Sequence, residues 1–294
     1  MNAALRPVIG ITLGDPAGIG PEIIQKALSS GQLPVDFDYR IIGDDSLATP
    51  GCPDASGARS AHLALETAVT AALAGQLAAV VTGPVSKALM QAVGFQFPGQ
   101  TEFFANRCGV ENFAMLLTGG TLTVALVTAH IPLHQVACAL CPAEIVRVGG
   151  LLVDFLTHRR RGAAPRIAVA GLNPHAGESG ALGTEEIEII GPAIQTLRQI
   201  WGAKASFEGP VSPDTVFYRA AGGQFDGVLC MYHDQGLIPL KLHAFDQGVN
   251  VTLGLPFPRT SPDHGTAFEI AGKGLARADS MIAAIAMACQ LAAK

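Results

Sequence analysis

The chain has 294 residues, of which 49% are hydrophobic, and its formal net charge at pH 7 is −5. This negative charge argues against a nucleic-acid-binding surface, which requires clustered Lys and Arg side chains. The apolar runs are too short, or too often interrupted by Gly and Thr, to span a bilayer, so the hydrophobic fraction indicates parallel strands covered by helices on both faces.

Apolar patterns typical of strands and helices alternate along the chain, which is the order of an α/β fold. Strands are predicted at residues 8–13, 38–42, 78–81, 114–117, 122–127, 166–170, 227–230 and 249–253. Helices are predicted at residues 22–28, 60–73, 85–93, 102–107, 143–157, 184–200, 214–221 and 280–292. Segment 44–57 is rich in Gly, Pro, Asp and Ser and is expected to be a surface loop. No long linker interrupts this order. We therefore expect residues 1–294 to form two interwound α/β lobes without linker-separated domains, with lobe boundaries that the sequence leaves open.

The N-terminal residues lack the charged start, apolar segment and cleavage site of a signal peptide, which predicts a cytoplasmic protein. Six cysteines are dispersed along the chain, and in a reducing compartment most of them are expected to be small apolar core residues. The basic run His158 to Arg161 ends a predicted helix, where cations favour the helix dipole. We interpret this run as a solvated helix terminus.

Three histidines follow predicted strands. His130 follows the run 121–129, His175 follows the run 167–174, and His233 lies in the sequence MYHDQG at 231–236, a predicted glycine-ended turn. Ligands usually bind at strand ends in α/β folds, although a single histidine there is more often a hydrogen-bonded structural residue. Because three histidines share this setting, we predict one divalent-metal site with coordination positions left open for substrate. Zinc, cobalt, nickel, manganese and magnesium all remain open as the metal.

Two segments are candidates for binding anionic groups. Segment 14–22 contains three glycines between a predicted strand and helix, so its backbone amides can approach an anion, although its spacing is not GxGxxG and a plain tight turn is the alternative. Segment 250–267 precedes a predicted helix that runs into residues 271–274. Lys241 and Arg259 offer a point charge and a bidentate fork, which together suit a phosphate and a carboxylate, unless they are ordinary surface cations.

Six motifs occur in order along the chain: GDPAGIGPE at 14–22, TGPVSK at 82–87, TEFF at 101–104, GLNPHAGE at 171–178, MYHDQG at 231–236 and RTSPDHGTA at 259–267. Together they resemble the 4-hydroxythreonine-4-phosphate dehydrogenase family of pyridoxal phosphate biosynthesis, from about residue 7 to about residue 290. The resemblance implies an isocitrate/isopropylmalate-dehydrogenase-like fold with two α/β lobes and an active-site cleft between them. It also implies a homodimer in which His233 reaches the partner's site.

The resemblance also implies a role for each matching residue. The implied metal ligands are His130, His175 and His233. The implied substrate-binding residues are Gln100, Thr101, Lys241, Asn250 and Arg259, with Asp214 and Asp234 as catalytic carboxylates. The implied cofactor-binding residues, for NAD or NADP, are Gly14, Asp15, His264, Gly265, Thr266 and Ala267. The implied reaction is the metal-dependent oxidation of 4-phosphohydroxy-L-threonine to 2-amino-3-oxo-4-phosphooxybutanoate, which loses carbon dioxide to give 3-amino-2-oxopropyl phosphate.

One position departs from the family pattern. The usual GHTE stands here as GQTE at 99–102. A glutamine can donate or accept a hydrogen bond but cannot be protonated, so any proton transfer by that histidine needs another group. The loop after the second strand is also shorter than usual in the family. Two alternatives therefore stay open: a dehydrogenase for D-threonate or D-erythronate 4-phosphate or for an aromatic cis-dihydrodiol, and a non-catalytic metal- or nucleotide-binding homologue. Lys241, Asn250 and Arg259 favour a phosphorylated substrate over a dihydrodiol.

Overall fold

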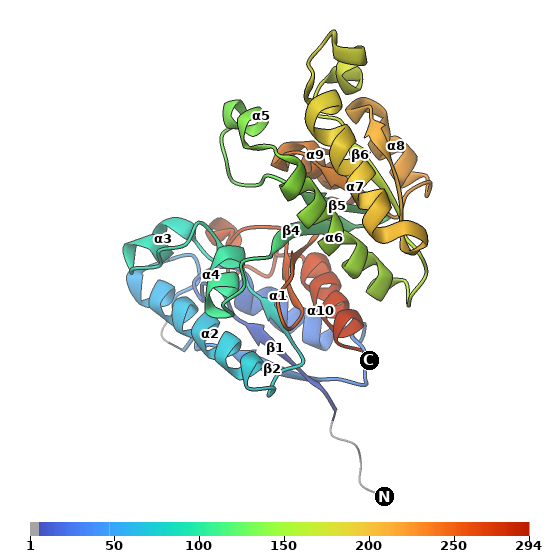
Figure 1. Cartoon of the computed structure of the whole chain (residues 1–294). Coiled ribbons are helices and arrows are strands. Elements are labelled where there is room, and N and C mark those ends of the chain that lie inside the picture. The colour runs from blue at the N-terminus through green and yellow to red at the C-terminus, as the bar shows by residue number, and fades with distance from the viewer. Residues whose placement is uncertain (1–5, 47, 294) are drawn as a thin grey trace, which may run out of the picture. The chain divides into compact units, whose positions relative to one another are not determined.

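The computed structural model describes residues 6–46 and 48–293 (Figure 1). Its contacts divide the chain into two compact units. Unit 1 consists of Met1–Glu111 and Asp246–Lys294, and unit 2 consists of Asn112–Phe245. Each unit combines strands with covering helices, which confirms the predicted α/β class.

In the described part of unit 1, five strands run in the order β2-β1-β3-β10-β9. They are β1 (Val8–Thr12), β2 (Asp38–Ile42), β3 (Ala79–Thr82), β9 (Val249–Leu253) and β10 (Arg259–Pro262). The first four in this order are parallel, and β9 is antiparallel to β10. Helices cover both faces, as predicted for strands without an alternating polar face. Helix α2 (Ala55–Leu73) packs with Val80 on one face, and α1 (Gly20–Ser29) and α10 (Asp279–Ala292) cover the other (Figure 1). The short helices α3 (Lys87–Ala92) and α4 (Gln100–Arg107) complete this unit.

In unit 2, the described strands run in the order β4-β5-β8-β6-β7. They are β4 (Ala114–Gly119), β5 (Leu122–Leu126), β6 (Arg166–Ala170), β7 (Ser206–Val211) and β8 (Gly227–Cys230). Strands β4 and β5 form an antiparallel hairpin, and the other neighbours are parallel. Val228 and Cys230 pack with α8 (Pro213–Ala221) and α9 (His233–Ala244), whereas Leu229 faces α6 (Pro142–Arg159). Helix α7 (Gly191–Trp201) packs on α6. The short helix α5 (Val136–Ala139) precedes α6 in the chain.

Several predicted elements need correction. Strands β7 and β10 were not predicted, because Ser206–Val211 contains Gly-Pro and Arg259–Pro262 is largely polar. The helix predicted to run into residues 271–274 is absent, and only the three-residue 3-10 turn Phe268–Ile270 is found there. The predicted surface loop ends early, because α2 begins at Ala55 with Asp54 as its N-cap, accepting a hydrogen bond from the Gly57 amide.

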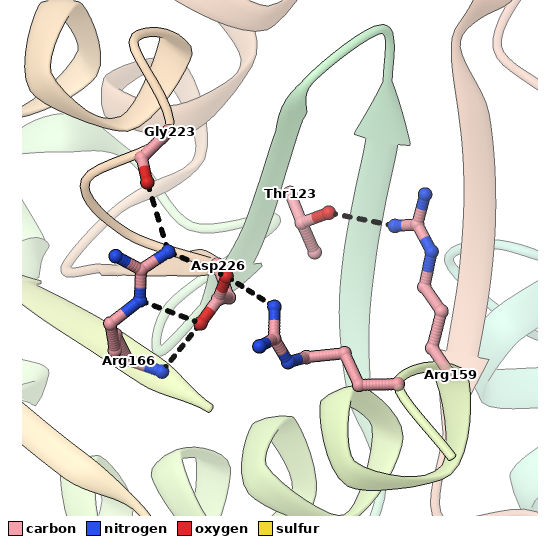
Figure 2. A network of polar contacts seen from close by, with 6 residues as sticks. Thr123, Arg159, Arg166, Gly223 and Asp226 are labelled. Carbon is pink, nitrogen blue, oxygen red and sulfur yellow. Dashed lines mark hydrogen bonds and ion pairs between the residues drawn. The ribbon is translucent and has the colours of Figure 1, made fainter. Parts of the chain in front are cut away.

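The basic run at the end of α6 is not a merely solvated terminus, contrary to our interpretation. Arg159 donates hydrogen bonds to the hydroxyls of Thr118 and Thr123, both at 3.0 Å. Arg160 forms a 2.5 Å ion pair with Asp226, which also accepts hydrogen bonds from the backbone amide and guanidinium of Arg166 (Figure 2). Burial acts to raise the pKa of Asp226, but the hydrogen bonds from Arg166 and the charges of both arginines outweigh it and hold the pKa below its usual range. The run therefore ties the end of α6 to the beginnings of β6 and β8.

The cysteines also differ from expectation. Only Cys230 and Cys289 are buried, while Cys108 is half-buried and Cys52, Cys138 and Cys141 are exposed. The prediction that most of them belong to the core is therefore wrong. Among the described residues, no single helix is long and apolar enough to cross a membrane; Leu133–Ala139 and Pro142–Arg159 meet that requirement only as a pair, across a 97° bend.

Candidate active site

The three predicted metal-binding histidines follow three neighbouring strands of unit 2. Strands β5, β8 and β6 are adjacent and parallel, so their carboxyl ends meet at the same edge of the sheet. The ring centroids of His130 and His233 are 5.7 Å apart. His175 lies beside α8 instead, with its Nδ1 4.0 Å from Asp214 Oδ2. All three histidines therefore lie at this edge of the sheet, but in two separate pairs: His130 with His233, and His175 with Asp214.

The donors at this edge suit a divalent metal by chemistry, since imidazole and carboxylate both bind such ions. Their arrangement in one chain is different: the described residues contain no group of three or more His, Cys, Asp or Glu that could hold a metal ion. Asp234 pairs with His233, with 2.6 Å between Oδ1 and Nδ1. A site that uses His130, His175 and His233 together therefore stays a prediction, and we derive no catalytic step from it.

His175 lies on a left-handed turn. The φ angles of residues 175–179 are 52°, 54°, 80°, 44° and 57°. Only Gly177 adopts this conformation without steric cost, and each other residue in it costs roughly 1–2 kcal/mol. Turns of this kind occur where the surrounding structure fixes the backbone, often at functional sites. The side chain of His175 is 63% exposed, so it is accessible to a ligand.

His233 is the first residue of α9, so the prediction of a glycine-ended turn at MYHDQG is wrong. Gly236 lies inside this helix, where the helix packs closely on β5. A Cβ added at Gly236 would lie 3.0 Å from Leu126 Cδ2. Lys241 is on the same helix, and its ammonium lies 6.0 Å from the centre of the Phe245 ring. Lys241 thus belongs to unit 2, whereas the other four predicted substrate-binding residues belong to unit 1.

Those four residues lie close together around β9 and β10. The antiparallel register pairs Arg259 with Thr252 and Ser261 with Asn250, which places these side chains on one face. Arg259 donates hydrogen bonds to Thr252 Oγ1 at 3.2 Å, to Gln100 Oε1 at 3.0 Å and to the hydroxyl of Thr82. The hydroxyl of Thr101 lies 3.3 Å from that of Thr252. The α4 residues Gln100 and Thr101 are thereby joined to the two strands.

Arg259 is the electrostatic centre of this group. It is only 2% exposed, and burial lowers its pKa to about 10, so the side chain stays cationic at neutral pH. Its Nε is buried without a hydrogen-bond partner, as is Oδ1 of Asn250. Leaving such a group unsatisfied costs roughly 1–3 kcal/mol. A ligand with an anionic oxygen and a hydrogen-bond donor would satisfy both atoms.

The predicted cofactor-binding residues also come together in unit 1. The amide of Ile19 donates a 2.9 Å hydrogen bond to the carbonyl of Thr266, which joins the loop 14–22 to the loop 264–267. Gly14 has φ +74°, and an added Cβ would lie 2.3 Å from the carbonyl oxygen of Pro84. Gly265 faces open space, and Ala267 is left-handed with φ 40°. A cavity of about 360 Å³ adjoins the first loop and is lined by residues that include Ala17, Cys52 and Asp54.

Two polar groups on these loops are buried without a hydrogen-bond partner. Asp15 accepts a hydrogen bond from the Ala17 amide through Oδ1, but its Oδ2 has no partner. Burial raises the pKa of Asp15 above its usual range. Nε2 of His264 is likewise buried and unpartnered, while its Nδ1 lies 3.1 Å from the carbonyl of Gly265. Both loops therefore carry polar atoms that a ligand could satisfy.

Sequence reasoning missed several residues that hold these groups. Thr82 and Gln235 lie within the motifs TGPVSK and MYHDQG, but no chemistry singled them out. Thr82 is bonded to Arg259, and Gln235 links two strand exits of unit 2. Glu186 is a buried carboxylate in the predicted helix 184–200, where nothing in the sequence distinguishes it from its exposed neighbours.

Comparison with known proteins identifies the family. The model of the family "Pyridoxal phosphate biosynthetic protein PdxA" matches residues 21–288. A 4-hydroxythreonine-4-phosphate dehydrogenase from Desulfosudis oleivorans is 43% identical over 98% of this chain and 97% of that protein. The structure of one from Klebsiella pneumoniae has a TM-score of 0.82 and 38% identity, covering 98% of this chain and all of that chain. A terephthalate 1,2-cis-dihydrodiol dehydrogenase from Burkholderia xenovorans LB400 is more distant, with 27% identity and a TM-score of 0.69, covering 97% of this chain and 98% of that chain.

The fold extends to remoter proteins. Isocitrate dehydrogenase from Methylococcus capsulatus shares 17% identity and a TM-score of 0.51, over 96% of this chain and 84% of that one, which is a likeness of fold alone. The predicted isocitrate-dehydrogenase-like fold is thus confirmed. Since the family model covers most of the sequence and full-length relatives exceed 40% identity, the chain belongs to the PdxA family of pyridoxal phosphate biosynthetic proteins.

Proposed function

We propose that the chain is an NAD(P)-dependent 4-hydroxythreonine-4-phosphate dehydrogenase. In this reaction 4-phosphohydroxy-L-threonine is oxidised to 2-amino-3-oxo-4-phosphooxybutanoate, which decarboxylates to 3-amino-2-oxopropyl phosphate. The activity named for its full-length relatives supports this proposal. The structural observation that carries it is the buried, cationic Arg259, whose Nε lacks a hydrogen-bond partner, as does Oδ1 of Asn250 on the neighbouring strand.

Unit 1 supplies groups suited to a phosphorylated, amino-bearing substrate. Three hydrogen bonds to Thr82, Thr252 and Gln100 orient the guanidinium of Arg259. Its buried Nε–H has no partner, so an anionic oxygen that reached it would complete its hydrogen bonding. Oδ1 of Asn250 is an acceptor and suits a hydroxyl or ammonium donor. Lys241 of unit 2, whose ammonium lies 6.0 Å from the centre of the Phe245 ring, is the further cation that the family resemblance implies for substrate binding. We propose that these groups bind the substrate's phosphate and polar substituents.

The cofactor is proposed to bind at the loops 14–22 and 264–267. The unpartnered carboxylate oxygen of Asp15 suits the hydroxyls of a ribose, which are donors. Nδ1 of His264 donates to the Gly265 carbonyl, so Nε2 of the neutral ring can accept a hydrogen bond from a nucleotide. The open space at Gly265 allows a cofactor group to approach the backbone there. In the loop 14–22 the amides of residues 15, 17, 18 and 19 already donate hydrogen bonds within the protein, so we expect this loop to contact the cofactor through side chains. NAD and NADP are both compatible with these groups.

We further propose that His130 and His175 hold a divalent metal together with His233 of a second copy of the chain. When bound, such a metal supplies Lewis-acid stabilisation of negative charge on a substrate oxygen. Asp214 is the proposed catalytic carboxylate beside His175. It can orient this histidine, because the hydrogen bond from the Ser212 hydroxyl lowers its pKa below the usual range and keeps it ionised. Asp234 is placed to do the same beside Nδ1 of His233.

A homodimer is supported by the surface around His233. Helix α9 exposes the large apolar side chains Ile238 and Leu242, followed by Phe245, and Leu133 is exposed on the segment after His130. Clustered exposed apolar side chains are typical of protein–protein interfaces. Because His233 begins the same helix, a contact through α9 would bring this residue to the partner chain.

The decisive assay is reduction of NAD or NADP, followed by absorbance at the NADH band. 4-Phosphohydroxythreonine, D-threonate 4-phosphate, D-erythronate 4-phosphate and an aromatic cis-dihydrodiol are tested in parallel, before and after chelation and metal re-addition. We expect turnover with 4-phosphohydroxythreonine that is lost on chelation and recovered with zinc, cobalt, nickel, manganese or magnesium. Preference for another phosphate ester would reassign the substrate, and no turnover with any of the four would indicate a non-catalytic homologue.

A further inference from the structure

The backbone just before the left-handed turn of His175 is held from one side by Gln235. This side chain is 5% exposed. Its Oε1 accepts a 2.7 Å hydrogen bond from the Met231 amide, and its Nε2 donates one of 2.7 Å to the carbonyl of Gly171. Met231 follows β8 and Gly171 follows β6. Gln235 therefore joins the strand exits that lead to His233 and His175.

Glu186 holds the same backbone from the other side and is also 5% exposed. Its Oε1 accepts hydrogen bonds from the amides of Leu172 and Asn173, both at 2.7 Å, and its Oε2 accepts one of 3.0 Å from the Asn173 side chain. Glu186 begins the single π-helical turn Glu186–Ile190, an element frequent at functional sites. The fit is close, since a Cβ at Gly177 would lie 2.6 Å from Oε2.

This arrangement explains how a strained turn can carry a candidate ligand. Four of the five residues 175–179 are not glycine yet have positive φ, and such backbone persists only where neighbouring groups fix it. We propose that Gln235 and Glu186 are positioning residues that fix the His175 turn against the β8 exit, and so set where His175 is presented. Their effect on a bound metal rests on the function proposed above, whereas their effect on the turn does not.

Two pairs of variants test this proposal. Gln235→Glu keeps the acceptor for Met231 but sets a carboxylate against the Gly171 carbonyl, and Glu186→Gln sets an amide donor against the Asn173 amide donor. Gln195→Glu on α7 and Glu188→Gln on the π-helical turn make the same chemical changes at exposed positions and are the controls. Gln235→Leu is measured as well, because a buried carboxylate can unfold the unit.

Two quantities are measured on each full-length protein. Amide hydrogen exchange of peptides covering residues 171–180 reports on the turn, and competition with a chromophoric chelator gives the affinity for Co²⁺. In the Gln235 and Glu186 variants we expect faster amide exchange of residues 171–180. We also expect the Co²⁺ affinity to fall by about 10- to 100-fold, as for other residues that orient metal ligands, and the Co²⁺ absorption spectrum to change. The two control variants are expected to match the wild type in both.

Three other outcomes would contradict the proposal or the metal site on which it partly rests. Unchanged exchange in the folded variants would overturn the positioning role. Faster exchange with an unchanged Co²⁺ affinity and spectrum would mean that these residues only stabilise the unit. A wild-type protein that binds no Co²⁺ would refute the metal site of the proposed function, and exchange would then decide alone whether the two residues fix the turn.

Discussion

Gln100 accepts a hydrogen bond from the guanidinium of Arg259, with 3.0 Å between Oε1 and Nη2. Its amide nitrogen donates to the carbonyl of Gly83 at 3.2 Å. This is the position where the family pattern has histidine. A neutral imidazole also offers one donor and one acceptor, so either side chain can in principle serve both partners. We therefore expect that residue 100 serves to orient Arg259, whether it is glutamine or histidine.

The substitution Gln100→His tests this interpretation. We expect turnover on 4-phosphohydroxythreonine at pH 8 to change by less than about tenfold, or roughly 1.4 kcal/mol. If the histidine were instead a general acid or base, restoring it would add about 10²–10⁴-fold. Steady-state kinetics of the two proteins measure the difference. A hundredfold gain would contradict the orienting role and would suggest that this chain's natural substrate is not that of its family.

The same variant should acquire a pH dependence that the wild type lacks at this position. Below its pKa, ordinarily about 6.5, an imidazole becomes cationic and loses its acceptor. It would then face the Arg259 cation, with the carboxylate of Glu102 as the other charge that acts on Arg259. We therefore expect the KM for the phosphorylated substrate to rise in Gln100→His, relative to wild type, as the pH falls from 8 to 6. Parallel KM profiles would show that residue 100 does not act through Arg259.

Arg259→Ala is expected to raise the KM for the phosphorylated substrate by about 10- to 100-fold, because a charge-assisted hydrogen bond is worth roughly 1.5–3 kcal/mol. The KM for NAD should change far less. The variant should also unfold at a lower temperature, since removing a buried side chain leaves a cavity and deprives Thr82, Thr252 and Gln100 of a donor. Arg40→Ala at an exposed position is the control. Equal effects on both KM values would move Arg259 out of the substrate site.

The fold was predictable where apolar periodicity was strong. The strands Asp38–Ile42, Arg166–Ala170, Gly227–Cys230 and Val249–Leu253 lie at their predicted positions. Prediction failed where tertiary contacts override local preference. Helix α9 contains Gly236, where the helix packs closely on β5: an added Cβ would lie 3.0 Å from Leu126 Cδ2, and the neighbouring side chains would have to shift. Strand β10 is buried although its sequence is polar, because Arg259 forms hydrogen bonds with Thr82 and Thr252 rather than with water.

The candidate site was predictable only in part. Motifs placed Gln100, Thr101 and Arg259 in the substrate site, and the structure brings these residues together in unit 1. The partners that hold them could not be predicted, because a hydrogen bond such as that between Thr82 and Arg259 depends on strand pairing, not on sequence distance. The same holds for Glu186 and Gln235. Both side chains are buried, and a Glu or Gln in the sequence gives no sign of its burial.

His175→Ala is expected to abolish metal binding and turnover while changing stability little. The side chain is largely exposed, and alanine and histidine have similar energetic costs at the positive φ of this position. We therefore expect the free energy of unfolding to stay within about 0.5 kcal/mol of the wild-type value. Metal analysis after dialysis and thermal unfolding measure the two effects. His134→Ala, at an exposed histidine in the same unit, is the control. Full metal occupancy with normal turnover would exclude His175 as a ligand.

Asp226→Asn tests the network that fastens α6 to β6 and β8. Asp226 accepts hydrogen bonds from Arg160 and from the backbone and side chain of Arg166 (Figure 2). Replacing this carboxylate with a neutral amide should lower the free energy of unfolding at pH 7 by roughly 1.5–3 kcal/mol, the usual value of hydrogen bonds to a charged group. Urea denaturation of the two proteins measures the difference, and Asp36→Asn at an exposed position should show none.

The loss in Asp226→Asn should also depend on pH with a definite sign. The pKa of Asp226 is lower in the folded protein than its ordinary value of about 3.9. A depressed pKa contributes stability that is fully present above the unfolded-state pKa and is lost as the pH falls through the folded-state pKa. The difference in unfolding free energy between wild type and Asp226→Asn should therefore be constant from pH 7 to about pH 5 and should shrink below about pH 4. A difference that stays the same down to pH 2 would show that the variant acts through packing rather than through the charge of Asp226.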